Sequence, residues 1–292
     1  MALGSIYALI ALGYTMVYGV LRFINFAHSD VLMLGAFAAY FLAPVALRVF
    51  PPHSLAGALV VMIAAAAICA CIGMLIELLA YRPLRNRPKL TVLITAIGVS
   101  LFIEFTTQNH AVFGAETRPF PELLPQRDFR LGGLSVNSND LVVPLLTVLL
   151  LGLLWLIVQK TKIGTAMRAV ALNQQAAALM GVSINRIISF TFGLGSALAA
   201  VAGILYALKA PGIEPLMGVQ PGLRAFVAAV LGGIGNLPGA ALGGVVLGLL
   251  ETFAGGMPGV SNYRDGIAFA ILILILLFKP AGLLGKAQVE KV

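Results

Sequence analysis

Long runs of apolar residues, separated by short polar segments, dominate this chain. A helix needs about 20 apolar residues to cross a bilayer. Six runs reach or approach that length, and each predicts a membrane-spanning helix. The six runs are Ala2–Val20, Val31–Val49, Leu55–Ile76, Leu90–Thr106, Leu141–Val158 and Ile187–Leu208.

Two further apolar stretches, Val219–Phe253 and Gly266–Phe278, are interrupted or short. The first half of the former, Val219–Leu231, is too short for an ordinary span and ends at a glycine-rich break, Gly232–Gly239. This pattern is typical of broken helices that meet inside a membrane. We therefore predict an all-α fold: a polytopic transmembrane helical bundle with broken or re-entrant helices and about eight or nine membrane segments, forming a single domain over residues 1–292.

Composition excludes an ordinary soluble domain. Apolar residues make up 60% of the chain and charged residues only 10%, with a mean hydropathy of +1.00. Soluble domains carry about 25% charged residues. The lipid bilayer is the solvent for which this surface is suited.

The net charge of +8 comes from two short loops rather than from a nucleic-acid-binding surface. The positive-inside rule places such loops in the cytoplasm. The N-terminus is then outside, the C-terminus inside, residues 107–140 form an external loop and residues 159–186 a cytoplasmic one. We expect no nucleic-acid partner. The basic residues are Arg82, Arg85, Arg87 and Lys89 in one loop, and Lys160, Lys162, Arg168 and Arg186 in the other.

Arg22–Asp30, with the sequence RFINFAHSD, places polar groups between two spans. Charged groups inside a membrane are costly, so they usually face a cavity or an interface. One interpretation is a helix break that lines a translocation pathway with Asn25, His28, Ser29 and Asp30. The alternative is a tight polar turn at the cytoplasmic surface, in which Asn25 and Asp30 cap the next helix.

The break at Gly232–Gly239, with the sequence GGIGNLPG, is the second candidate. The glycines, together with Asn236 and Pro238, interrupt the helix, so that some backbone groups lose their helical hydrogen bonds. Amides at the start of the next half-helix favour an anion such as a carboxylate. A nucleotide loop is excluded because GxxxxGK[ST] is absent. Either a pathway role or close helix packing explains the stretch. The candidate pathway residues here are Gly232, Gly233, Gly235, Asn236, Pro238 and Gly239.

Lys160–Arg186 is long for a link between membrane helices. Within it, Ala166–Met180 predicts one short amphipathic helix that ends at Gly181. Such a helix could rest on anionic lipid or could act as a lever held by a cytoplasmic motor.

Isolated charged residues receive simpler interpretations. Glu77 and Glu104 lie near predicted helix ends, and Lys209 and Arg224 can extend to the headgroups. No catalytic residue set, metal-ligand cluster or P-loop is visible, so we expect no catalytic residues, no metal, no cofactor and no enzymatic activity of the chain itself.

The same stretches resemble a known family. GSIYALIALGYTMVYGVLRFINFAHSDVLMLGAF and AFVAAVLGGIGNLPGAALGGVVLG resemble the signatures of the LivH-type permeases of branched-chain amino acid ABC importers, and GLLGKAQVEKV resembles their C-terminus. The resemblance covers nearly the whole chain. Ser29 is a departure, because the family usually has Gly after NFAH.

The resemblance implies an ATPase-coupling role for the third stretch. ABC importer permeases carry a cytoplasmic coupling helix marked by E-A-A-x-x-x-G, and this chain keeps that spacing with Gln in place of the acid. The residues implied to couple the permease to the ATPase are Arg168, Asn173, Gln175, Ala176, Ala177, Met180 and Gly181.

The family also implies an assembly in the cell inner (plasma) membrane. Its parts are this permease, a second homologous permease, two ATP-binding subunits and an extracytoplasmic substrate-binding protein. The implied function is alternating-access import of branched-chain or similar amino acids. Two alternatives are a same-family permease for urea or short amides, and a secondary transporter or channel that works alone.

Overall fold

The computed structural model describes residues 1–85, 87–125, 128–131, 134–257, 259 and 263–285. Within this part of the chain, seven helices are long and apolar enough to cross a membrane, and two shorter apolar helices accompany them. The predicted polytopic helical bundle is confirmed, and all six predicted long spans correspond to helices. The long helices are α1 (Ala2–Leu21), α2 (His28–Ala46), α3 (Leu55–Ile76), α4 (Lys89–Gln108), α5 (Ser138–Lys160), α8 (Ile184–Lys209) and α10 (Leu237–Gly256).

Shorter elements connect the long helices. A π-helical turn, η1 (Glu77–Tyr81), and a 3-10 turn, η2 (Arg82–Leu84), extend α3. Strand β1 (Arg118–Pro119) pairs with β4 (Gly212–Ile213), and β2 (Asp128–Leu131) forms a hairpin with β3 (Leu134–Asn137). The remaining helices are α6 (Lys162–Leu172), α7 (Gln174–Leu179), α9 (Val219–Gly232) and α11 (Arg264–Phe278).

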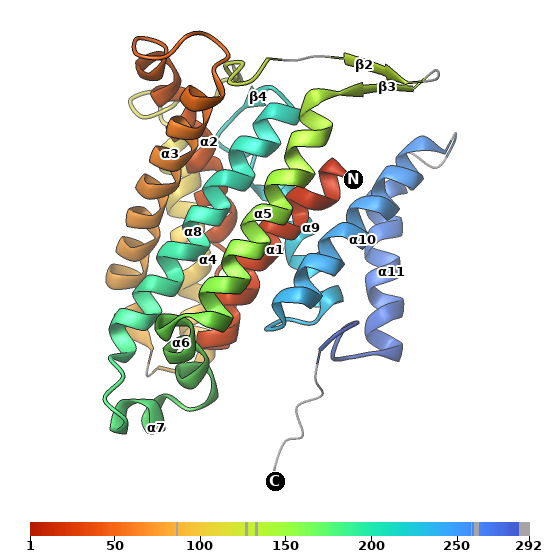
Figure 1. Cartoon of the computed structure of the whole chain (residues 1–292). Coiled ribbons are helices and arrows are strands. Elements are labelled where there is room, and N and C mark those ends of the chain that lie inside the picture. Colours follow the sequence, from red (N-terminus) through yellow and green to blue (C-terminus); the bar gives the residue numbers. More distant parts are fainter. Residues whose placement is uncertain (86, 126–127, 132–133, 258, 260–262, 286–292) are drawn as a thin grey trace.

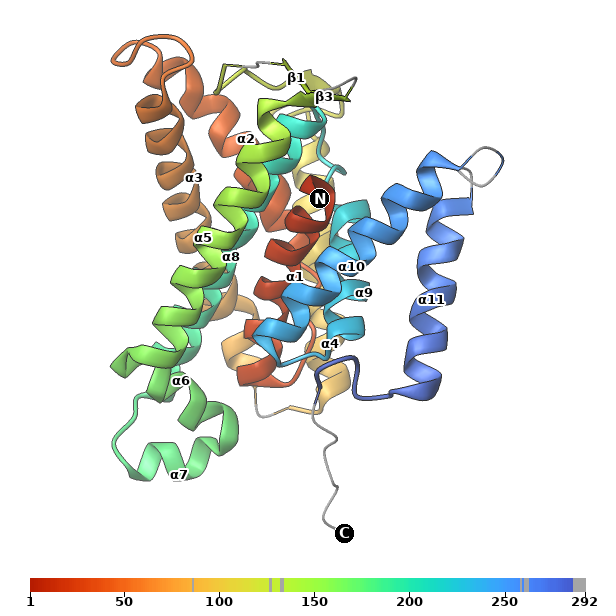
Figure 2. The ribbon, with the colours of Figure 1, turned by 45° about the vertical axis from the view of Figure 1, so that its right-hand side comes forward.

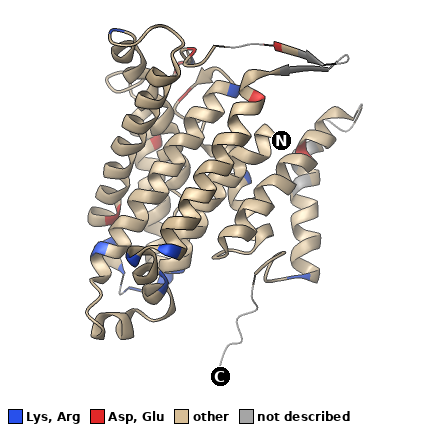
Figure 3. Ribbon diagram, in the orientation of Figure 1, with Lys and Arg blue, Asp and Glu red and all other residues tan. Residues whose placement is uncertain are grey.

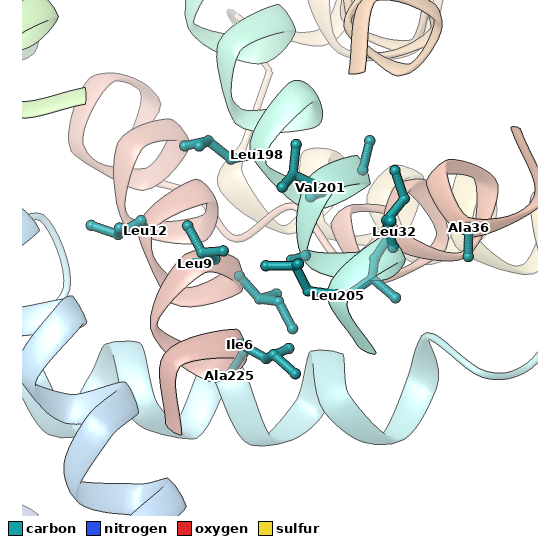
Figure 4. Packing of buried hydrophobic residues seen from close by; sticks show 14 of the residues in the cluster. Ile6, Leu9, Leu12, Leu32, Ala36, Leu198, Val201, Leu205 and Ala225 are labelled. Atoms are coloured by element: carbon teal, nitrogen blue, oxygen red, sulfur yellow. The ribbon is translucent and has the colours of Figure 1, made fainter. Parts of the chain in front are cut away.

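Helix α1 lies at the centre of the bundle, where it packs against α8, α9, α10 and α5 (Figures 1 and 2). Most of α1 is buried, whereas only a small part of α4 and α5 is buried. Leucine, isoleucine and valine side chains of α1, α2 and α8 interlock around this centre, with Ala225 of α9 at its edge (Figure 4). The exposed apolar faces of α4 and α5 therefore remain for lipid or for other subunits.

Small residues let α1 and α10 approach closely. A Cβ added to Gly244 would collide with the backbone of Ala8, and one added to Gly248 would collide with the backbone of Gly4. Glycine at these positions brings two helix backbones together, which is how membrane helices gain packing energy without a hydrophobic drive between them.

The two ends of the bundle differ in charge. Lys and Arg gather at the end that carries α6 and α7, whereas the α2–α3 turn, the hairpin and the β1–β4 pair lie at the opposite end (Figure 3). Both basic loops of the sequence thus lie on one side, as the positive-inside interpretation requires.

The prediction of one helix over Ala166–Met180 is wrong. Two helices, α6 and α7, cover this stretch and meet at Asn173, whose backbone is extended at φ −155°. The Asn173 side chain accepts a hydrogen bond from Ala176 N at 3.0 Å. This N-cap favours the start of a new helix at Gln174 over the continuation of α6. The reason is that the Asn173 side chain bonds to a backbone N–H that a continuous helix would pair with a backbone carbonyl.

Candidate functional site

The first break is a buried, non-helical connection between α1 and α2. Helix α1 ends at Leu21 and is followed by Arg22, which has the left-handed φ of 56°, and α2 begins at His28. Asn25, His28, Ser29 and Asp30 are all buried. The α2 N-cap is Ala27, which has no side-chain capping bond. The alternative of a surface turn in which Asn25 and Asp30 cap the helix is therefore wrong.

Helix α2 begins deep in the bundle. A Cβ at Gly13 of α1 would collide with the His28 ring, and the rings of Tyr14 and His28 lie 4.7 Å apart between centroids. Gly13 precedes the end of α1 by eight residues, which corresponds to about 12 Å along the helix. The His28 ring at the start of α2 thus reaches the level of Gly13, as expected for a chain that re-enters the bundle before helix resumes.

Hydrogen bonds hold the polar groups of this break. The Tyr81 hydroxyl donates to Asn25 Oδ1 at 2.6 Å, and the Ser100 hydroxyl donates to Asp30 Oδ2 at 2.5 Å. The Ser29 hydroxyl donates to the Phe26 carbonyl at 2.9 Å. Asp30 also lies in the first turn of α2, where the partial positive charge of the helix N-terminus favours an anion.

The start of α9 packs against the start of α2. A Cβ on Gly218 would collide with the Ser29 carbonyl, and one on Gly222 would collide with the Ser29 side chain. Ser29 therefore packs directly against two glycines of α9. Two helix N-termini meet here within the bundle.

The second break is confirmed between α9 and α10, over residues 233–236. Gly233 and Gly235 have φ values of 103° and 94°, a region open to glycine but costly for other residues. The Asn236 side chain accepts from Gly239 N at 3.3 Å and so caps α10, with Pro238 in its first turn. Gly232 and Gly239 lie against each other. Close packing and a sharp turn therefore both operate in this stretch, although α10 is longer than the half-helix that we expected.

The end of the described chain holds this turn. Leu283 N donates to the Leu231 carbonyl at 2.8 Å, and Leu284 N donates to the Gly232 carbonyl at 3.1 Å. The Asn236 side chain donates to the Leu284 carbonyl at 2.6 Å. These bonds satisfy carbonyls that the end of α9 would otherwise leave without a partner. Sequence reasoning missed this contact, because no local pattern marks it.

The third stretch forms a projecting arm. Ala177 is buried, whereas Gln175, Ala176 and Met180 are exposed. Gly181 follows α7 with φ 83°, and its N–H donates to the Ala178 carbonyl, so the predicted helix stop is confirmed. Three large apolar side chains stand out on the arm. They are Leu172, Leu179 and Met180, which are 82%, 89% and 84% exposed.

One cavity of about 600 Å³ brings parts of all three stretches together. Arg22 comes from the first break, Arg168 from α6, and Gly235, Asn236 and Pro238 from the second break. Arg168 also donates to the Val158 carbonyl and so fixes α6 to the end of α5. The arm and the glycine turn therefore share a wall of the same space.

A buried ion pair was missed by sequence reasoning. Arg224 pairs with Glu251 at 2.7 Å, and the Tyr7 hydroxyl donates to Glu251 at 2.7 Å. The expectation that Arg224 extends to the headgroups is wrong, because α9 is held by this charge to α1 and α10. The signal was present: Glu251 is the only acid in an apolar run, and intramembrane charges usually have partners.

Glu77 is also tied internally rather than to a headgroup. It forms an ion pair with Arg85 and accepts a hydrogen bond from the Ser189 hydroxyl. Arg85 in turn donates to Asn185 Oδ1 at 2.8 Å, and burial lowers the pKa of this guanidinium below its usual range. The cluster fastens the end of α3 to the start of α8.

Comparisons with known proteins agree over nearly the full length. A family model described as the permease component of the branched-chain amino acid transport system matches residues 1–276. The high-affinity branched-chain amino acid transport system permease protein BraD of Pseudomonas aeruginosa is 40% identical, over 100% of this chain and 95% of that protein. LivH of Escherichia coli, described in the same words, is 38% identical, over 99% of this chain and 94% of its own.

A more distant relative covers less. The ribose import permease protein RbsC of Haemophilus influenzae is 32% identical over 41% of this chain and 39% of its own length. No solved structure matches the chain.

Proposed function

Because the chain belongs to the family of the branched-chain amino acid transport system permease component, we propose that it is the membrane-spanning subunit of an ATP-driven amino-acid importer. In this proposal a second homologous permease completes the pathway, two ATP-binding subunits drive it, and an extracytoplasmic binding protein delivers a branched-chain amino acid. The chain lies in the inner membrane with its basic end in the cytoplasm.

The exposed apolar arm is the observation that carries this proposal. Helices α6 and α7 project from one end of the bundle (Figure 2), and Leu172, Leu179 and Met180 of this arm are exposed. Helix α7 is too short to rest stably on a membrane by itself, since isolated short helices are marginal. Exposed apolar side chains at such a projection mark an interface with a protein or with a membrane. Its place in the family's coupling motif makes the ATP-binding subunit the partner.

The two breaks supply the moving part. Alternating access requires an element with two arrangements. We assign this role to the turn at Gly233 and Gly235, because glycine tolerates backbone changes there and because the turn and α6 line the same cavity. Closure of the ATPase dimer would displace the arm, and the arm would displace the turn. Asn25, His28, Ser29 and Asp30 would line the path beside the start of α9.

The termini follow from the same orientation. Residues 279–285 lie against the α9–α10 turn at the basic end, so the C-terminal side is cytoplasmic. Helix α1 begins nearer the opposite end, so the N-terminal side is external (Figure 1).

The test is Ala176→Arg, made in the complete importer. Ala176 is exposed, so the chain should insert and fold, while the ATP-binding subunits should fail to co-purify and ATP-driven leucine uptake should fall to background. Ala115→Arg is the matched control, because it places the same charge on an exposed alanine of the opposite end and should leave co-purification intact. Unchanged uptake in Ala176→Arg, or uptake by the permease without ATP-binding subunits, would contradict the proposal.

A further inference from the structure

The cavity shared by the three stretches is electropositive. Arg22 and Arg168 both line it, and none of its described lining residues is acidic. Its other polar walls are Gln159, Asn236 and Tyr18. Arg168 uses part of its guanidinium on the Val158 carbonyl and reaches Thr165 Oγ1 at 3.4 Å, and an arginine has five N–H donors in all. The cavity therefore offers donors and positive charge to an anion.

Arg22 occupies a strained backbone position beside this cavity. Its φ of 56° is left-handed, which costs about 1–2 kcal/mol for a residue with a Cβ. Glycine is the usual residue at such a helix end. Strained residues cluster at functional sites because something other than stability retains them. Glycine at position 22 would relieve the strain but would also remove the guanidinium that lines the cavity.

The cavity lies at the depth where lipid headgroups lie. Val158 and Gln159 belong to the last turn of α5, next to Trp155 and Lys160. Lys160 Nζ lies 5.8 Å from the centre of the Trp155 ring, and that ring is 41% exposed. Tryptophan and lysine at a helix end are interfacial anchors in membrane proteins.

Apolar surface continues from the cavity in two directions. A smaller space of about 110 Å³, with walls that include Met16, Val20 and Met167, adjoins it towards the bundle centre. The exposed face of α5 leads away from it towards the opposite leaflet. That face is formed by Leu141, Leu145, Val148, Leu149, Leu153 and Leu156, all at least half exposed.

We propose that the cavity binds the phosphate of an anionic phospholipid, with Arg22 and Arg168 on the headgroup and the acyl chains along α5. Arginine recognises phosphate through charge-assisted hydrogen bonds, and basic pockets between membrane helices on the cytoplasmic side bind lipid headgroups. The shared chemistry is a phosphate oxyanion. The apolar continuation favours lipid over free phosphate as its source.

The position gives the lipid a regulatory role. Its headgroup would join the end of α1 to helix α6 and the α9–α10 turn, and the last two are the parts that the proposed function moves. The inference shares the membrane orientation with the proposed function, but it does not depend on the cargo or on the ATP-binding subunits.

The experiment is photolabelling in vesicles of phosphatidylcholine that contain a small fraction of photoactivatable phosphatidylglycerol. The complete importer is labelled, and the attachment sites are mapped by mass spectrometry. Photoactivatable phosphatidylcholine in parallel vesicles measures labelling that needs no anionic headgroup. A third arm adds inorganic phosphate in excess.

The expected result is preferential labelling by phosphatidylglycerol at residues 15–22, 158–172 and 235–238, with no competition by inorganic phosphate. Arg22→Gln and Arg168→Gln should each reduce labelling about fivefold, as expected for one basic residue near anionic lipid. Arg87→Gln, which removes an exposed charge from the other basic loop, is the control and should leave labelling unchanged.

Arg22→Gly separates binding from folding. Glycine relieves the left-handed strain, so thermal stability should be kept or raised while labelling falls. Equal labelling by the two lipids, labelling elsewhere on the chain, or full competition by inorganic phosphate would each overturn the proposal. If the complete importer shows no ATP-driven uptake but keeps its preference for phosphatidylglycerol, the proposed function is contradicted and the lipid site is not.

Discussion

Removing one charge from the buried pair of Arg224 and Glu251 should destabilise the bundle strongly. Glu251 is 3% exposed and accepts from both Tyr7 and Arg224, each at 2.7 Å. In Glu251→Gln the arginine keeps its charge, because a guanidinium does not deprotonate in proteins. It would then lie half-enclosed among α1, α9 and α10 without the Glu251 carboxylate.

The magnitude follows from the cost of an uncompensated buried charge. Breaking such a pair from one side costs about 3–5 kcal/mol. At roughly 2–4 °C per kcal/mol for a large chain, Tm should fall by about 6–20 °C. Tyr7→Phe removes two hydrogen bonds, the one donated to Glu251 and the one accepted from Arg224, but leaves the ion pair, and should cost about 1–3 kcal/mol. The double variant Arg224→Gln with Glu251→Gln removes both charges of the pair and should recover most of the loss.

The assay is the thermal unfolding of the purified chain in detergent, followed by the loss of its monodisperse peak in size-exclusion chromatography. Glu122→Gln is the matched control, because Glu122 is exposed and its neutralisation should change stability by less than about 0.5 kcal/mol. If Glu251→Gln unfolds like the parent chain, or if the double variant is no more stable than the single one, the pair does not hold α9 as we infer.

Three further outcomes are expected. Asn25→Ala leaves the buried Tyr81 hydroxyl without its partner and should cost about 1–3 kcal/mol and reduce uptake; normal uptake and an unchanged Tm would exclude the first break from the pathway. Asn236→Leu removes both the cap of α10 and the bond to Leu284, so ATP-driven uptake should fall with insertion intact, whereas parent-like uptake would show that the turn does not move cargo. Gly248→Val should be destabilised by at least about 1–3 kcal/mol through collision with α1. Gly255→Val is the control and should fold normally, because an added side chain there meets nothing within 4 Å. Equal Tm values for the two variants would refute the close α1–α10 packing.

Hydropathy predicted the long helices well because a bilayer imposes a length of apolar chain on each span. The break at Gly232–Gly239 was also predictable, since glycine and proline in an apolar run leave backbone groups that must find partners. Local composition could show that the helices are interrupted at Arg22–Asp30 and at Gly232–Gly239. It could not show that Arg22, Arg168 and Gly235 line one cavity.

The remaining features depend on contacts between distant residues. Glu251 meets Arg224 across a helix break, and Leu284 meets Asn236 across the whole of α10 and α11. The end of α6 at Asn173 was missed for a different reason. Alanine-rich sequence on both sides favours one continuous helix, and a single side-chain cap reverses that preference.

The most direct test of the proposed coupling is a measurement of the distance between the arm, formed by α6 and α7, and helix α10. Spin labels at Ile163 of α6 and Leu242 of α10, both exposed, are placed in a chain whose Cys69 and Cys71 are replaced by alanine. In the complete importer, ATP binding should shift the distance distribution, and hydrolysis should restore it. If ATP-driven uptake proceeds while that distribution stays unchanged, the arm does not drive the α9–α10 turn.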